Sequence, residues 1–251
     1  ALDALNKNIN GQSDKFLEMY EGNPKTPDVF AARRGVANLE FRLAKLTPVN
    51  PSCDTCTAKA TSGILRVQSG YTNGIEPRNL VKALSYWNAY QYFNIWVVKT
   101  IASDAGITLG YAQFPGASVN QQGFMSTDGV VIMASQMEDP ESTTLTHETG
   151  HWLGLYHTWG DNTCGDDGVY DTPPQHTSNG FTEDPAADPS NPNPSKFPWH
   201  VGLPSGIFYG CLADSVNPAG EMFMNYMDYT NDDYCTMFSK GQVEVMNSVL
   251  V

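Results

Sequence analysis

Three of the five histidines in this 251-residue chain fall within eleven residues, HETGHWLGLYH, which run from 147 to 157. Residues four apart share one face of an α-helix, so a helix here presents His147 and His151 side by side. Glu148 then lies one step round the helix and can reach a water molecule beside the histidines without being a metal ligand. This spacing constrains the fold most, because it requires a helix at 147–151 and a turn after it.

Gly154 predicts where that helix ends, because glycine tolerates the positive φ of a sharp turn. The turn would bring in His157 as a third ligand. Three neutral imidazoles and one open position are typical of catalytic zinc, whereas a structural site is closed by four protein ligands. Zinc polarises a carbonyl group and lowers the pKa of a bound water molecule, and Glu148 would move that water's proton. We therefore predict a hydrolytic zinc centre.

Charge and composition exclude some classes of partner. The chain has 14 Lys and Arg against 27 Asp and Glu, a net charge of −13, so it lacks the basic face that nucleic-acid binding needs. The acidity fits calcium binding or cationic substrates, and it fits solubility alone equally well. No apolar run is long enough to span a membrane. The acidic balance also fits a secreted, extracellular protein. The chain starts at Ala1 with no initiator Met and no signal-type segment, which predicts a processed form from which any export signal and pro-segment have been removed.

Hydrophobic periodicity predicts an α/β organisation in the first part of the chain. Helices are expected at Asp14–Tyr20, Asn79–Tyr92 and Ser142–Leu153, and strands at Val36–Leu43, Ile64–Val67, Ile95–Ile101, Thr108–Phe114 and Gly129–Met133. Residues 160–220 are rich in Asp, Asn, Pro, Gly and Ser, which predicts an irregular region that cations or disulfides hold in place. A last helix is expected at Phe238–Val249, capped by Ser239.

The five cysteines leave several pairings open. Cys53 and Cys56 form a CxxC pair, but no second CxxC completes a four-cysteine zinc site. A structural disulfide or two separate bridges is the favoured interpretation. The odd count leaves at least one thiol unpaired, or paired with a cysteine outside this sequence.

Several segments together resemble one family of zinc peptidases. HETGHWLGLYH resembles the extended zinc motif of the metzincins, and 225–229 (NYMDY) resembles the methionine turn of that clan. The segments LGYAQFPG, VYDTPPQ and MNYMDYTNDD are similar to the pappalysin family, in its ulilysin- and mirolysin-like branch. The resemblance implies a secreted zinc metalloendopeptidase that cuts proteins or peptides and is made as a zymogen, with its own pro-segment as a partner before activation.

The same resemblance implies the fold. We expect one α/β (α+β) metzincin-type catalytic domain over residues 1–251, with a twisted mixed sheet and an active-site helix in its N-terminal half. The N-terminal subdomain would cover about 1–154, and an irregular C-terminal subdomain about 155–251.

The resemblance also implies roles for residues after the zinc motif. Met227 would form the hydrophobic floor beneath the three histidines, and Tyr229 would stabilise the tetrahedral intermediate. Asp233, or its neighbour Asp232, would pair with a basic substrate side chain, which implies cleavage on the N-terminal side of Arg or Lys.

The loop 165–172 resembles the family's calcium loop, with oxygen ligands expected from Asp166, Asp167, Val169, Asp171 and Thr172. A solvated acidic turn is the alternative. For the cysteines, the family pattern implies a bridge between Cys211 and Cys235. Cys164 would then pair with Cys53 or Cys56 or remain a thiol.

Two alternatives to an active peptidase would keep the metal site. A non-enzymatic module would use the zinc fold for recognition only, and an amidase would act on small substrates. The presence of Glu148 favours an enzyme over a recognition module, because a module without catalysis would commonly have lost the base. The methionine turn favours a peptidase over an amidase.

Overall fold

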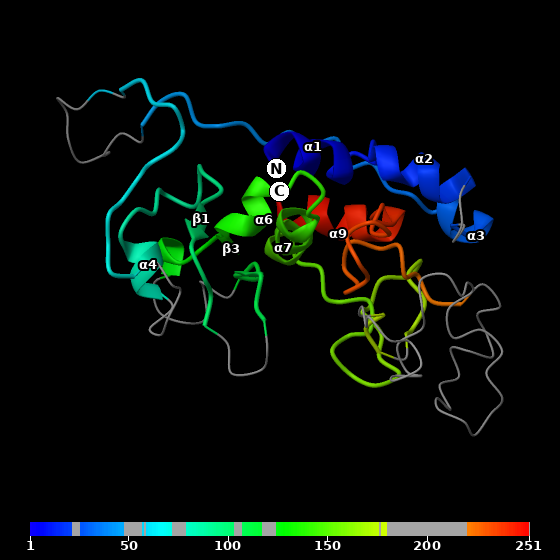
Figure 1. Cartoon of the computed structure of the whole chain (residues 1–251). Helices are drawn as coiled ribbons and strands as arrows, with labels where there is room; N and C mark the ends of the chain where they lie inside the picture. Colours follow the sequence, from blue (N-terminus) through cyan, green and yellow to red (C-terminus); the bar gives the residue numbers. More distant parts are fainter. Residues whose placement is uncertain are drawn as a thin grey trace. The chain divides into compact units, whose positions relative to one another are not determined.

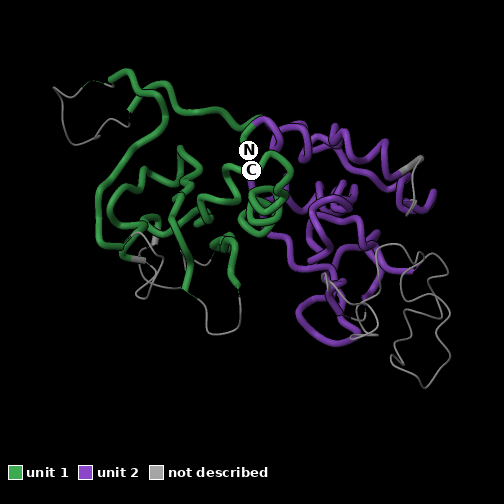
Figure 2. The backbone as a smooth tube through the Cα atoms, viewed as in Figure 1, with its two compact units in different colours: residues 1–2, 40–152 green, residues 3–39, 153–251 purple. Residues whose placement is uncertain are grey.

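The computed structural model of the chain describes residues 1–21, 26–47, 57, 59–71, 79–102, 107–116, 124–175, 177–179 and 220–250. Contacts divide the chain into two compact units, which Figure 2 shows in different colours. The first unit comprises residues 1–2 and 40–152, and the second comprises 3–39 and 153–251. Residues 3–39, expected in the N-terminal subdomain, therefore cluster with the C-terminal part of the chain.

A three-stranded mixed sheet lies in the first unit, with β3 (Val130–Met133) between β1 (Ile95–Val98) and β2 (Gly110–Ala112) (Figure 1). β1 pairs with β3 in parallel, and β2 pairs with β3 antiparallel. The central strand is buried, as a run of β-branched residues predicts. The expected mixed α/β fold is confirmed, with strands shorter than predicted.

Helices of the first unit pack against this sheet. They are α4 (Asn79–Ala83), α6 (Ala134–Glu138) and α7 (Thr144–Trp152), with a 3₁₀ turn η1 at Phe124–Ser126. α7 contacts both β2 and β3. The helix expected over 79–92 ends at Ala83, because the side chain of Asn94 accepts a hydrogen bond from Trp87 N and donates one to Trp87 O. These bonds hold the segment after α4 as a loop.

Two expected strands do not form. The structure assigns no strand to 36–43 or 64–67. Val36, Ile64 and Leu65 are exposed instead of packed on a sheet. A strand needs a hydrogen-bonded neighbour, and apolar alternation alone does not supply one.

The second unit holds four helices among its described residues: α1 (Leu2–Ile9), α2 (Asp14–Glu21), α3 (Asp28–Ala31) and α9 (Lys240–Val249). Its core combines Phe16, Met19 and Phe30 with 222–224 and Met237. α9 begins as predicted, because Ser239 and Gln242 form a reciprocal capping box. None of the described helices is both long and apolar enough to cross a membrane.

Candidate active site

Helix α7 presents the paired histidines from a buried position. The hydroxyl of Ser142 accepts a hydrogen bond from Thr144 N at the start of the helix. Every residue from Thr144 to His151 is buried. The helix ends at Trp152, and Gly154 adopts a φ of 91°, the left-handed conformation expected of it. Local sequence therefore both begins and ends this helix at the predicted places.

The two helix histidines lie against each other. The rings of His147 and His151 meet edge to face with centroids 4.7 Å apart, and Phe114 packs on His151 at 5.1 Å. The i, i+4 spacing thus produces the predicted adjacency.

Glu148 lies in the protein interior, where burial raises the pKa of its carboxyl group to about 8. Gly110 of β2 faces this side chain. A Cβ atom at Gly110 would lie 2.9 Å from Glu148 Cγ and 3.1 Å from Oε1. Only glycine therefore leaves room for the carboxylate at this point, which the sequence alone does not reveal.

His157 is held in an aromatic setting after the turn. Its ring stacks on Trp159 with centroids 4.3 Å apart and planes 3° apart, and Tyr229 meets it edge-on at 4.8 Å. Its Nδ1 lies 2.5 Å from Asp161 Oδ1. Burial lowers the pKa of His157, while the bond to Asp161 opposes that shift.

The three histidines come together as the motif predicts. One ligand atom from each of His147, His151 and His157 lies within 4.8 Å of the others. Three imidazoles converging beside a buried carboxylate fit the donor set of a catalytic zinc ion.

The predicted methionine turn is a tight, buried turn. Met227 is fully buried, and its amide donates to Asn225 Oδ1. Met227 O accepts a hydrogen bond from Thr158 N, which ties the turn to the residue after His157. Tyr229 remains 51% exposed, so it can meet a ligand from solvent.

Asp228 anchors the methionine turn, a role that the sequence gives no signal for. Its carboxylate accepts hydrogen bonds from Gln175 Nε2, from Asn179 N and Nδ2, and from Tyr229 N. Burial raises the pKa of Asp228 to about 7, and the bonds from Asn179 oppose the shift. Gln175 and Asn179 are thereby fastened to the residue that precedes Tyr229.

The two acidic residues expected to select substrates differ in their surroundings. The Asp233 side chain is 69% exposed and lies 4.0 Å from Lys15 Nζ. Lys15 also donates to the backbone oxygen of Asp232. A lysine of this chain is therefore already beside the pair.

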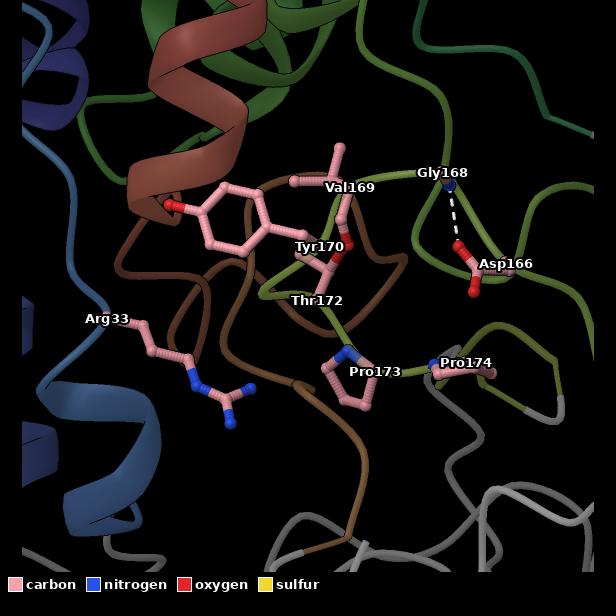
Figure 3. Close-up of a pocket in the computed structure, with 8 residues that line it drawn as sticks. All are labelled: Arg33, Asp166, Gly168, Val169, Tyr170, Thr172, Pro173 and Pro174. Atoms are coloured by element: carbon pink, nitrogen blue, oxygen red, sulfur yellow. Dashed lines mark hydrogen bonds between the residues drawn. The ribbon is translucent and has the colours of Figure 1, made fainter. Parts of the chain in front are cut away.

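Carboxylate oxygens of the loop 165–172 accept hydrogen bonds from other residues of the same loop. Asp166 Oδ1 accepts from Gly168 N, as the dashed line in Figure 3 shows. Asp167 Oδ1 accepts from Val169 N and Thr172 Oγ1. Asp167 Oδ2 is buried and has no hydrogen-bond partner among the described residues, and burial raises the pKa of Asp167 to about 6. A buried carboxylate oxygen without a hydrogen-bond partner has the chemistry of a calcium ligand.

This loop also lines an open pocket with a cationic side chain. The lining residues are Arg33, Asp166, Gly168, Val169, Tyr170, Thr172, Pro173 and Pro174, all in the second unit (Figure 3). The Arg33 guanidinium donates to the backbone oxygen of Asp171.

Asp171, expected to bind calcium, has another use in the structure. Its Oδ1 accepts from the Ser239 hydroxyl, and its Oδ2 accepts from Gly241 N in the first turn of α9. Both carboxylate oxygens are therefore committed to the start of α9, where a negative charge is favoured by the helix dipole. The distance of 68 residues between Asp171 and Ser239 hides this contact from sequence inspection.

The predicted bridge between Cys211 and Cys235 is wrong. Cys235 carries a buried thiol that donates to Thr230 O at 3.3 Å. Cys164, for which a thiol was one option, is disulfide-bonded. Cys53, Cys56 and Cys211 lie outside the described residues. The cysteine count does not disclose this hydrogen bond of the Cys235 thiol.

Comparison with known proteins defines the class. The fold matches mature mirolysin of Tannerella forsythia in complex with a cleaved peptide (TM-score 0.71, 32% identity), covering 98% of this chain and 81% of that one. A promirolysin mutant of the same organism matches with TM-score 0.70 and 32% identity, over 98% and 71% of the two chains. The structure is thus that of a metzincin catalytic domain.

Sequence comparison gives the family. The Peptidase_M43 pattern, described as pregnancy-associated plasma protein-A, matches residues 78–251. The chain therefore belongs to this family, the pappalysins. Extracellular metalloprotease 1 of Coccidioides posadasii is 31% identical over 167 residues, which are 64% of this chain and 50% of that protein. The chain thus spans half the length of this curated relative.

Proposed function

We propose that this chain is the catalytic domain, over residues 1–251, of a secreted zinc-dependent endopeptidase. The observation that carries the proposal is the convergence of His147, His151 and His157 within 4.8 Å, with Glu148 beside His147 on the same buried helix. Membership of a peptidase family and relatives named as extracellular metalloproteases support both the activity and the secretion.

The residues of this chain divide the work of peptide hydrolysis. His147, His151 and His157 would hold zinc, which supplies Lewis acidity toward a peptide carbonyl and acidifies a water molecule. Glu148 takes the proton of the attacking water and delivers it to the leaving amide nitrogen. Tyr229, half exposed beside His157, donates its hydroxyl hydrogen to the oxyanion of the tetrahedral intermediate. Met227 supports the site from below as a buried apolar residue.

Metal removal tests the proposal directly. A zinc chelator should abolish cleavage of a denatured protein substrate, and one equivalent of zinc should restore it. Calcium added alone should not restore cleavage, because calcium prefers oxygen ligands and three imidazole nitrogens bind it poorly. The measurement is the appearance of new N-termini by mass spectrometry. Cleavage that persists in metal-free protein would refute a zinc peptidase, and zinc binding without any cleavage would favour the recognition module.

We further propose that the enzyme cuts on the N-terminal side of Arg or Lys, with Asp233 or Asp232 as the acidic partner. In support, the carboxylate of Asp233 already has an ammonium group, that of Lys15, 4.0 Å away. Each of Asp233→Asn and Asp232→Asn should be profiled on the same denatured proteome.

The variant that removes the true partner should lower cleavage before Arg and Lys by about tenfold or more, since charge-assisted contacts contribute about 1.5–3 kcal/mol. Cleavage before other residues should persist in both variants. A wild-type profile without preference for basic residues would contradict the assignment of either aspartate.

We also propose that the loop 165–172 binds a structural calcium ion through Asp166, Asp167, Val169 O and Thr172. The buried, unpartnered Oδ2 of Asp167 supports this site. Asp171 is the weakest of the expected ligands, because both of its carboxylate oxygens already accept hydrogen bonds.

Calcium should stabilise the wild-type protein by about 2.7 kcal/mol when present at a hundredfold its Kd. The Asp167→Asn variant should lose this gain, because it removes a ligand charge. Urea unfolding with and without calcium measures the effect, with the exposed Glu18→Gln as a control that keeps the gain. If calcium stabilised Asp167→Asn and wild type equally, the calcium site would be refuted and the loop would be interpreted as a solvated acidic turn.

A pro-segment of this chain is the expected partner before activation, in line with the promirolysin neighbour. It would keep the active site closed until the protein is outside the cell.

A further inference from the structure

Asp161 follows the zinc motif and contacts the third expected zinc ligand, His157. Its Oδ1 lies 2.5 Å from His157 Nδ1, four residues back along the chain. The His157 side chain is only 13% exposed, while that of Asp161 is 59% exposed. The pair therefore joins a largely buried ring to a carboxylate at the surface.

This contact selects one tautomer of the imidazole. A carboxylate accepts hydrogen bonds and cannot donate them when ionised, so Nδ1 must carry the hydrogen. Nε2 is then the nitrogen whose lone pair can bind a metal. Carboxylates in this position are known in general to orient metal-binding histidines and to raise their basicity.

The ring is also fixed in orientation. Trp159 covers one face of His157 in a parallel stack, and the ring of Tyr229 contacts that of His157 in an edge-to-face arrangement. Trp159 and Tyr229 touch each other with centroids 4.8 Å apart. Stacking limits the tilt of the ring, and the bond to Asp161 limits its rotation about Cβ–Cγ.

The backbone is shaped to return Asp161 to His157. Gly160 and Asp161 adopt φ values of 55° and 56°, and Gly160 N donates to His157 O. A side chain at Gly160 would meet Asp166 O at 2.3 Å. Aspartate tolerates the left-handed region better than most residues, so the turn and the carboxylate occur together at modest cost.

We propose that Asp161 is a positioning residue that holds His157 with Nε2 available to zinc. This inference rests on the proposed zinc function, because it assigns Asp161 a role toward the metal and not toward the substrate. The carboxylate is largely exposed and therefore screened by solvent. We accordingly expect its removal to weaken zinc binding by about tenfold, the lower end of the 10- to 100-fold range for such partners.

Zinc affinity is the first readout, measured by competition with a coloured chelator. Asp161→Ala should bind zinc about tenfold more weakly than wild type. The zinc affinity of Asp161→Asn should lie between those of wild type and Asp161→Ala, because the amide oxygen of asparagine still accepts a hydrogen bond from Nδ1 but carries no charge. Asn162→Ala is the matched control: it removes a side-chain bond to Gly160 O in the same turn without touching His157.

The second readout is the tautomer of His157 in zinc-free protein, read from imidazole nitrogen chemical shifts at about pH 8, where histidine is neutral. Wild type and Asp161→Asn should carry the hydrogen on Nδ1, and Asp161→Ala should shift toward Nε2. A role of Asp161 in loop stability alone would leave this signal unchanged.

The outcomes separate this inference from the proposed function. Wild-type zinc affinity in Asp161→Ala, or an equal loss in Asn162→Ala, would overturn the role of Asp161 even if the enzyme is a zinc peptidase. Absence of proteolysis would overturn the proposed function without affecting the zinc and tautomer measurements. If Asp161→Ala does not fold, Asp161→Asn decides: unchanged affinity there overturns the role.

Discussion

Replacing Glu148 with glutamine is expected to lower kcat/KM by about 10²- to 10⁴-fold, the usual contribution of a general base. The amide keeps the shape of the side chain in its buried place beside Gly110 but cannot accept the proton of water. Zinc should stay bound at wild-type stoichiometry, because the expected ligands are the three clustered histidines and Glu148 is not among them. Steady-state cleavage of a fluorogenic peptide and metal analysis of the same sample measure the two effects.

Glu138→Gln is the matched control, since Glu138 is an exposed glutamate at the end of α6. It should retain wild-type kcat/KM. Full activity of Glu148→Gln would show that another group moves the proton, and Glu148 would no longer be the general base. Loss of zinc together with activity would instead make Glu148 a support of the metal site.

The largest effect on stability is expected at Asp171. Its replacement by alanine should lower the free energy of unfolding by about 3 kcal/mol, because two hydrogen bonds to a buried carboxylate are lost at about 1.5 kcal/mol or more each. The first turn of α9 also loses a favourable negative charge. Urea unfolding followed by far-ultraviolet circular dichroism measures the change.

Asp171→Asn is the control that keeps the shape of the side chain and one acceptor, so about half of the loss is expected. Both measurements should be made with calcium and with a calcium-selective chelator. A loss that is equal in the two conditions supports the tether to α9. A loss of stability that occurs only with calcium would show that Asp171 is a calcium ligand, as the family resemblance implies.

The helices that the sequence predicted well are those whose signals are local. α7 follows from the i, i+4 histidines and ends near Gly154, and α9 follows from Ser239 three residues before Gln242. Caps and glycine stops act within a few residues, so they can be read from the chain directly. The strands expected at 36–43 and 64–67 failed because pairing depends on a partner segment that periodicity does not specify.

By itself, the sequence determined the candidate metal ligands and the candidate base, because a helix of 3.6 residues per turn places His147, Glu148 and His151 without help from distant residues. Tertiary structure alone decided what surrounds them. Asp171, expected to bind calcium, accepts hydrogen bonds at the start of α9, and Cys235, expected in a disulfide, is a buried thiol. Several partners are chemically suitable for each of these side chains, and the one that each contacts depends on which distant segments the folded chain brings within hydrogen-bonding distance.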